Sequence, residues 1–172
     1  YRGHKDSSIG DYGCEYKLLG TPDRIKGQAA SLARRLTVCG ATVNSRCGLH
    51  VHLDARKLTV GRCIQFINWI AWWEDWWFSI MPDSRRGSSY CLRLVEEYAD
   101  RMGRRCWRLR GSNDHHEWVN GPTTKKTVEI RIHGGTLNPH KIVGWLSVCE
   151  DLLYLLNSKK EFPPIEYDCS KD

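Results

Sequence analysis

Two short segments of the sequence place ionisable side chains at every second position. Residues 49–54 read Leu-His-Val-His-Leu-Asp, and residues 127–133 read Thr-Val-Glu-Ile-Arg-Ile-His. Successive side chains of an extended strand point to opposite faces, so each segment has one apolar face and one polar face. The polar faces together carry His50, His52, Asp54, Thr127, Glu129, Arg131 and His133.

These residue types favour a binding site over an ordinary solvated sheet face. Imidazole and carboxylate groups are ligands for divalent cations, and a guanidinium is suited to phosphate. A solvated face, which is the alternative, is instead typically built from Lys, Glu and Thr. We therefore expect a metal or anion site on this face, joined by Glu15 and Lys17 from an earlier strand, residues 13–19, of the same sheet.

The elements that position these residues follow from periodicity, caps and helix-breaking residues. Strands are predicted at residues 13–19, 47–54 and 127–133, and a polar loop at 111–125. Helices are predicted at residues 22–39, 60–80 and 91–102, and from Pro139 to about Leu156; the first and last each begin with a cap residue, Thr21 or Asn138, followed by proline. Because the strands alternate cleanly, we expect an antiparallel sheet with helices packed on one face, in the α+β class.

Three segments resemble a known family. Residues 44–56, NSRCGLHVHLDAR, resemble the "CGLHVHVDAR" motif of the amidoligases, a branch of the glutamine-synthetase-like carboxylate-amine ligases. Residues 127–138, TVEIRIHGGTLN, resemble that family's "TVEFRLHSGTLN". Between them, residues 81–91 are similar to its "PxSRRxNxYC" segment. The order of these motifs holds from about residue 6 to residue 157, so the resemblance covers most of the chain.

The resemblance implies a glutamine-synthetase-like catalytic domain that joins a carboxylate to an amine through an acyl-phosphate. The implied cofactors are ATP and Mg²⁺ (or Mn²⁺). Carried over by motif position, the metal ligands are His50, Glu129 and Glu15. The implied contacts to phosphate or to the substrate carboxylate are His52, Arg131, Arg85 and Arg86, of which Arg131, His52 and Arg85 are catalytic.

One departure from the family pattern concerns the start of the chain. The family begins with a "GxExE" strand whose glutamates complete the metal sites, and this sequence lacks it. We expect a fragment, a site completed by another chain, or a degenerate copy that has kept the fold. The ligase-like domain is expected to span residues 1–158, followed by a tail, residues 159–172, that contacts the surface or a partner.

Composition limits the other functions. The chain has 172 residues, a formal net charge of +6 and 41% hydrophobic residues, which indicates one globular domain. No stretch of about eighteen residues is continuously apolar, so a membrane-spanning helix is excluded and a cytoplasmic protein is expected. Its eight cysteines include no C-x-x-C pair, which argues against a zinc ribbon. We expect mostly buried thiols, with disulfides as the alternative.

Other features keep a second reading open. A tryptophan stripe spaced as one helix face, suited either to core packing or to an oligomer or partner interface, contains Trp69, Trp72, Trp73, Trp76 and Trp77. An arginine cluster around Trp107, residues 101–110, would suit nucleic acid if the chain were a catalytically inactive scaffold. His115 and His116 lie in the polar loop, which is either a lid over the site or an ordinary exposed loop.

Overall fold

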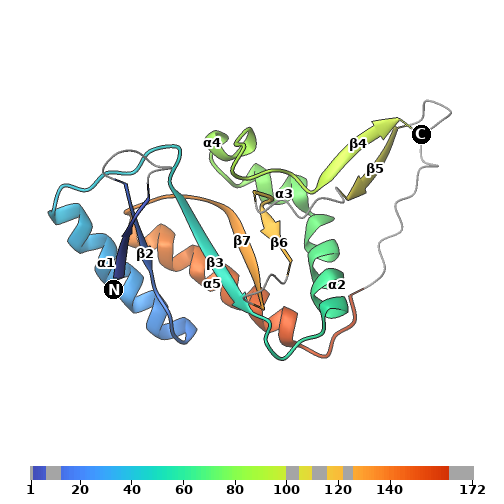
Figure 1. Ribbon diagram of the computed structural model, residues 1–172, viewed down its shortest axis with the longest axis horizontal. Coiled ribbons are helices and arrows are strands. Elements are labelled where there is room, and N and C mark those ends of the chain that lie inside the picture. The colour runs from blue at the N-terminus through green and yellow to red at the C-terminus, as the bar shows by residue number, and fades with distance from the viewer. Residues whose placement is uncertain (1, 7–12, 100–104, 110–115, 122–125, 163–172) are drawn as a thin grey trace.

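The structure is a computed structural model that describes residues 2–6, 13–99, 105–109, 116–121 and 126–162. Its strands pair in antiparallel fashion and are mixed with helices along the chain, which confirms the α+β class (Figure 1). In chain order the elements are β1 (Arg2–Lys5), β2 (Cys14–Lys17), α1 (Pro22–Val38), β3 (Gly48–Asp54), α2 (Val60–Ala71), α3 (Glu74–Ser79), α4 (Asp83–Arg86), β4 (Val95–Ala99), β5 (Arg105–Leu109), β6 (Val119–Asn120), β7 (Thr127–Gly134) and α5 (Pro139–Asn157).

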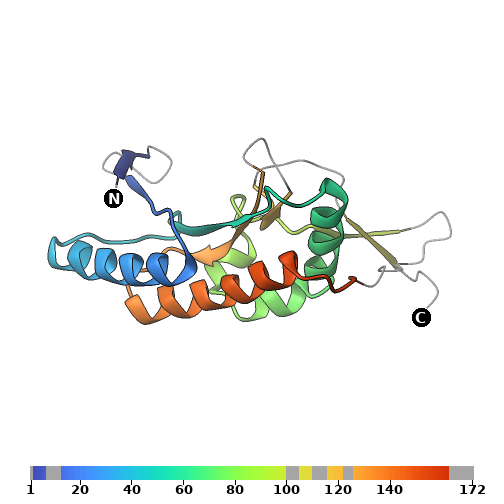
Figure 2. The ribbon, with the colours of Figure 1, turned by 90° about the horizontal axis from the view of Figure 1, so that it is seen from below.

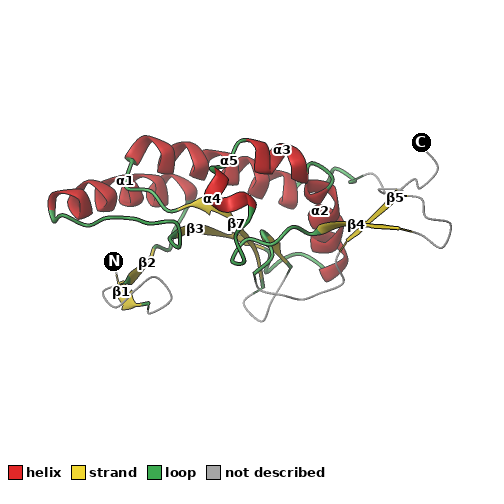
Figure 3. Ribbon diagram, turned by 90° about the horizontal axis from the view of Figure 1, so that it is seen from above, coloured by secondary structure: helices red, strands yellow, loops and turns green. Residues whose placement is uncertain are grey.

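The sheet that matters for function has three strands in the order β3-β7-β6, with β7 in the centre. Helices α1 and α5 lie side by side and cover the same face of β3 and β7 (Figures 2 and 3). The side chains that fill this covered face include Leu53, Val128, Ile130 and Ile132, which are at most 2% exposed. Their alternation along the strands leaves the polar residues on the opposite face, as predicted.

Hairpin β1–β2 forms a separate sheet, which corrects one prediction. The strand at residues 13–19 exists as β2, but its hydrogen bonds go to β1 and not to β3. All four β2 residues are exposed, so no apolar face directs this strand into the core. The hairpin stands away from the main sheet in Figures 2 and 3, and Glu15 and Lys17 therefore do not extend the polar face of β3 and β7.

The long helix predicted at residues 60–80 is two helices, α2 and α3, which meet at Trp72 and Trp73. The break turns the chain so that Trp77 and Phe78 reach the core, where Trp77 is 8% exposed. The carboxylate of Glu74, 2% exposed, accepts hydrogen bonds from the Leu94 amide and the Trp118 indole at 2.6 and 2.7 Å. As a result, the tryptophans of the predicted stripe lie on two helices and at the junction between them, and not along one helix face.

The division leaves part of the stripe in the core and part on the surface. Trp69 is half-buried and packs on Phe162, with ring centroids 5.4 Å apart. Trp72, Trp73 and Trp76 are each about half exposed. Core packing thus explains only the two ends of the predicted stripe, Trp69 and Trp77.

The helix predicted at residues 91–102 is wrong, since residues 95–99 form β4, which pairs with β5. The backbone before β4 already has distant partners. The Leu92 amide donates to the carbonyl of His116 at 2.8 Å, and the Leu92 carbonyl accepts from Trp118 at 2.9 Å. These bonds use groups that a helix would pair four residues along the chain.

The polar loop predicted at residues 111–125 contains β6, an edge strand of the main sheet. Glu117, Trp118, Val119 and Asn120 are buried, and the Arg131 amide donates to the Trp118 carbonyl at 2.7 Å. Residues 116–121 are therefore neither a lid nor an exposed loop. Residues 111–115 and 122–125, and with them His115, lie outside the described part of the chain.

Two further expectations are tested in part. Within the described residues no helix is both long and apolar enough to span a membrane. The predicted buried thiols are found at Cys63, Cys91 and Cys149, whereas Cys14 and Cys39 are exposed. Burial raises the pKa of the Cys149 thiol to about 12, so this group acts as a small apolar side chain.

Helix α5 has a well-defined cap at each end. Asn138 Oδ1 accepts from the amides of His140 and Lys141, which confirms the predicted cap ahead of Pro139. At the other end the Arg62 guanidinium, from α2, lies over the ring of Phe162 at 4.0 Å. It also donates to four carbonyls, those of Leu155, Leu156, Ser158 and Lys160.

We predict that Arg62→Met lowers the free energy of unfolding by about 2 kcal/mol, because the carbonyls at the end of α5 lose charged donors. Urea denaturation measures this change. Arg34→Met, at an exposed position of α1, is the matched control and should change stability by less than about 0.5 kcal/mol. Equal losses in the two variants would contradict the capping role of Arg62.

Candidate active site

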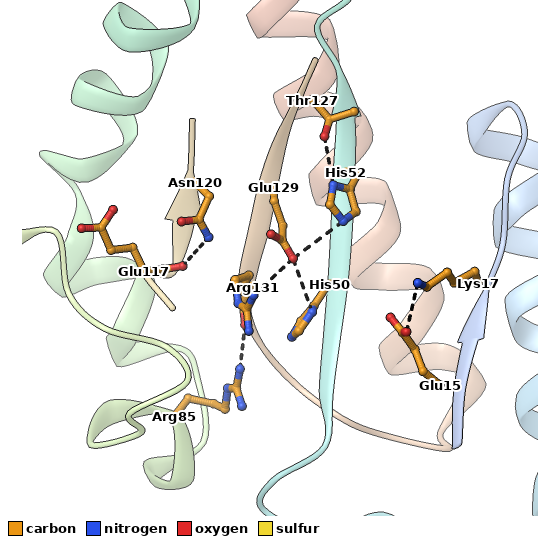
Figure 4. Close-up of polar contacts among 10 residues, drawn as sticks. All are labelled: Glu15, Lys17, His50, His52, Arg85, Glu117, Asn120, Thr127, Glu129 and Arg131. Carbon is orange, nitrogen blue, oxygen red and sulfur yellow. Dashed lines mark hydrogen bonds and ion pairs between the residues drawn. The ribbon is translucent and has the colours of Figure 1, made fainter. Parts of the chain in front are cut away.

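Three side chains on the polar face of β3 and β7 surround one carboxylate oxygen, Oε1 of Glu129 (Figure 4). It lies 3.4 Å from His50 Nδ1, 3.7 Å from His52 Nε2 and 3.6 Å from Arg131 Nη1. The ring of His52 is fixed from its other side by Thr127, whose Oγ1 is 3.0 Å from Nδ1. The structure therefore brings together His50, His52, Glu129 and Arg131, as the sequence predicts.

A β-bulge decides which residues of β7 join this cluster. Leu49 pairs with His133 but Val51 pairs with Ile130, so His50 alone faces two residues of β7, Arg131 and Ile132. The extra residue shifts the alternation, and the ring of His133 packs on Trp145 of α5, with centroids 5.1 Å apart. The prediction that His133 shares the polar face is therefore wrong.

The two arginines of α4 lie apart from the open face. Arg85 is 1% exposed and donates to the carbonyls of Ile132 and Arg131 at 3.2 and 2.7 Å. Arg86 donates to the carbonyls of Phe78 and Ser79 at the end of α3. Neither arginine presents a guanidinium on the surface of the cluster, although Arg85 lies directly beneath Arg131 in Figure 4.

Two acidic residues named in the sequence analysis also lie outside the cluster. Glu15, on β2, forms an ion pair with Lys17 at 3.2 Å and is drawn apart from Glu129 in Figure 4. Asp54 pairs with Arg56, and the two hydrogen bonds at 2.9 and 2.7 Å hold the pKa of its carboxyl at about 2. Among the described residues, the predicted metal ligand Glu15 therefore does not join His50 and Glu129.

The electrostatics of the cluster favour a neutral His50. Partial burial is the main cause that lowers its pKa, to about 4, and the charges of Arg131 and Arg85 and the neighbouring His52 lower it further. The carboxylate of Asp6 acts in the opposite direction. A neutral imidazole at physiological pH is able to bind a metal ion without first losing a proton.

Two residues of the site were not found from the sequence. Asp6, the residue after β1, acts electrostatically on His50. Asn120 of β6 pairs directly with Glu129, so both share the polar face, and it is 6% exposed. Its Nδ2 donates to the Glu117 carbonyl at 2.9 Å, which fixes the amide. The adjacent Trp118 and Val119 were the signal that a buried strand, and not a loop, lies here.

His50 and Glu129 are spaced as two ligands of a divalent cation would be. Donor atoms that share one ion at about 2.1 Å lie roughly 3 to 3.5 Å apart, and His50 Nδ1 and Glu129 Oε1 are separated by 3.4 Å. No group of three His, Cys, Asp or Glu side chains within the described ranges forms a metal site. Two protein ligands therefore fit an ion such as Mg²⁺ or Mn²⁺ that takes its other ligands from water or phosphate.

One buried nitrogen beside that position lacks a hydrogen-bond acceptor among the described residues. Arg131 Nε is buried and has no hydrogen-bond partner among the described residues, while the Arg131 side chain is 12% exposed. An unsatisfied charged donor is costly in a site of low polarity, and a phosphate or carboxylate oxygen would satisfy it. The cluster thus places an imidazole and a carboxylate next to a guanidinium whose Nε has no partner among the described residues.

The alternative hypothesis, a nucleic-acid-binding surface at residues 101–110, depends on side chains that the structure does not describe. Arg101, Arg104 and Arg110 lie outside the described ranges, and Arg105 and Arg108 are described only as backbone positions of β5. The predicted nucleic-acid surface therefore stays a prediction.

The fold and site define an α+β domain with a polar, His-, Glu- and Arg-lined sheet face opposite two helices. Residues 23–153 match the sequence profile of a family described as "putative amidoligase enzyme". This match covers more than half of the chain, and the protein belongs to that family. Comparison with curated proteins and with solved structures gives no match.

We predict that His133→Phe makes stability less dependent on pH. Burial is the main cause that lowers the pKa of His133 below its usual 6.5, so below about pH 6.5 the unfolded chain binds a proton that the folded chain does not. The wild-type free energy of unfolding should therefore fall more steeply between pH 6.5 and 5 than that of the variant. Denaturant titrations at each pH measure both slopes.

His140→Gln removes an exposed histidine at the start of α5 and serves as the control. Its slope should match that of the wild type. If His133→Phe also keeps the wild-type slope, the imbalance in proton binding does not arise at His133.

Proposed function

We propose that the protein is an ATP-dependent carboxylate-amine ligase with a glutamine-synthetase-like catalytic domain, residues 1–158, and that its active site is the polar face of β3 and β7. The observation that carries the proposal is the convergence of His50, His52 and Arg131 on Glu129 Oε1 at 3.4 to 3.7 Å. Membership of the amidoligase family supports the reaction class.

The reaction has two steps. A carboxylate oxygen of the acid attacks the γ-phosphorus of ATP, and ADP leaves. The amine then attacks the carbonyl carbon of the acyl-phosphate, loses a proton and displaces inorganic phosphate. Phosphoryl transfer spreads negative charge over three oxygens, so it depends on positioning and on fixed positive charge more than on covalent chemistry.

The residues of the cluster divide this work by charge. Glu129 and the neutral His50 would hold a Mg²⁺ or Mn²⁺ ion, which when bound polarises phosphate oxygens. Arg131 would neutralise the transferred phosphoryl group through its guanidinium, which is 12% exposed and lies 3.6 Å from Glu129. His52, held by Thr127, would donate a hydrogen bond to the same group. Asn120, beside Glu129 on β6, would orient the substrate next to the metal side.

The contact between Glu129 and Arg131 explains why a divalent cation and a phosphate group would bind to the cluster together. Each of these charges is partly neutralised by the other across 3.6 Å. A bare cation would break the pairing of Glu129 and leave Arg131 without its carboxylate, and a bare phosphate would do the reverse. A metal-bound nucleotide supplies a partner to each side at once.

We predict that Glu129→Gln lowers affinity for Mn²⁺ measured in the presence of a non-hydrolysable ATP analogue by at least about tenfold, since the variant loses the carboxylate at the centre of the cluster. Electron paramagnetic resonance of free Mn²⁺ reports binding directly. Asp151→Asn, an exposed carboxylate of α5, is the control and should bind like the wild type. Unchanged binding in Glu129→Gln would place the metal elsewhere.

We predict that Arg131→Met lowers turnover by about 100-fold while the Kd of the ATP analogue changes less than about threefold, because this charge acts mainly on the transferring group. Phosphate release is measured with MgATP, hydroxylamine as the amine and pooled amino and dicarboxylic acids as the carboxylates. Release must depend on the acid. A wild-type protein that binds the analogue yet releases no phosphate with any acid would be the inactive scaffold.

A further inference from the structure

Arg85 is a buried cation for which the proposed reaction has no direct use. It belongs to α4, a single helical turn that begins after Pro82, and it is 1% exposed. No carboxylate forms an ion pair with it in the described part of the chain. A guanidinium buried in this way is stabilised only if good acceptors surround it.

Its acceptors are the two carbonyls of the β7 bulge. Nη2 donates to the Arg131 carbonyl at 2.7 Å and Nε donates to the Ile132 carbonyl at 3.2 Å. These are the two residues that His50 alone faces across the ladder. A bulge disrupts the regular hydrogen bonds between neighbouring strands. The guanidinium of Arg85 supplies N–H donors to these two carbonyl oxygens at the bulge.

The same guanidinium also lies close to His50. A Cβ placed on Gly48 would lie 2.6 Å from His50 Nε2 and 3.5 Å from Arg85 Nη2. The absence of a side chain at Gly48 thus lets the His50 ring pack against the backbone, next to Arg85. Arg85 therefore bonds to the backbone of the bulge, whereas the side chains of His50 and Arg131 approach Glu129 (Figure 4).

We propose that Arg85 is a positioning residue of the active site, which holds the bulge of β7 so that Arg131 and His50 face Glu129, and that it does not itself contact phosphate. The placement of Arg131 stands on the structure, and its effect on turnover rests on the proposed function. This role differs from the direct phosphate contact that the family resemblance implies for Arg85.

The first test needs no ligand. In Arg85→Lys, which keeps the charge but loses the two-nitrogen fork, we expect the Nε–H resonance of Arg131 and the amide resonances of Ile132 and His133 to shift in ¹⁵N-edited NMR spectra. The amides of Leu53 and Val128 should not shift. Arg56→Gln, which changes an exposed arginine at the end of β3, is the control and should leave all of these signals in place.

The second test is a double-mutant cycle on phosphate release. If Arg85 acts through Arg131, Arg85→Lys alone should lower turnover by about 10- to 100-fold, and adding Arg85→Lys to Arg131→Met should cause little further loss. The Kd of the ATP analogue should change less than about threefold in Arg85→Lys. Arg85→Met, checked for folding by circular dichroism, should match or exceed the loss in Arg85→Lys.

The outcomes separate the two proposals. A folded Arg85→Lys protein with unchanged Arg131 and β7 resonances overturns the positioning role, whatever the activity. Additive losses in the cycle, together with a raised Kd, would make Arg85 a direct phosphate ligand and also overturn it. If the wild type releases no phosphate, the ligase proposal fails, and the NMR comparison alone decides the role of Arg85.

Discussion

The pairing of β3 with β7 is the contact on which the rest of the structure depends. It joins segments about 75 residues apart, and its register sets Glu129 opposite His52. A slip of one residue would either turn the histidines of β3 into the layer covered by α1 and α5 or turn Ile130 of β7 out of that layer. Because Val128 and Ile130 are fully buried, the apolar side of the sheet fixes the register. The chemistry on one face is thus positioned by hydrophobic burial on the other.

The bulge shows how a local irregularity can serve both faces. Continued alternation would have placed His133 beside Arg131, adding a third imidazole next to a guanidinium. The extra residue instead places His133 against Trp145, where the ring fills the core and its Nδ1 lies 2.6 Å from the Gly134 carbonyl. The cost is a disrupted ladder, which the buried fork of Arg85 offsets. A polar face and a packed core are thereby fitted to a strand of eight residues.

The sequence predicts the parts of the fold that local patterns determine. Strict alternation identified β3 and β7, and a cap followed by proline identified α1 and α5, so four residues of the site were placed correctly. The bulge could not be predicted, because no residue pattern within β7 indicates it. It depends on Arg85, which is 46 residues away from Arg131 in the sequence. Glu74 likewise directs the chain after α3 through Leu94 and Trp118. Short strands such as β1 and β6 depend on their partners more than on their own residues, so Glu15, on the partner of β1, was misplaced and Asn120, on β6, was missed.

The arrangement at Glu129 also limits the functions that this polar face can have. Three groups share one oxygen at 3.4 to 3.7 Å, distances longer than strong charged hydrogen bonds. The carboxylate is therefore surrounded by donors that it does not fully engage, and Arg131 Nε engages none in the described part of the chain. A purely structural network of buried charges is stable when its bonds are short and complete. A network left open on the exposed side of a well-packed sheet is instead suited to a ligand that completes it, with a cation for the imidazole and carboxylate and an oxyanion for the guanidinium.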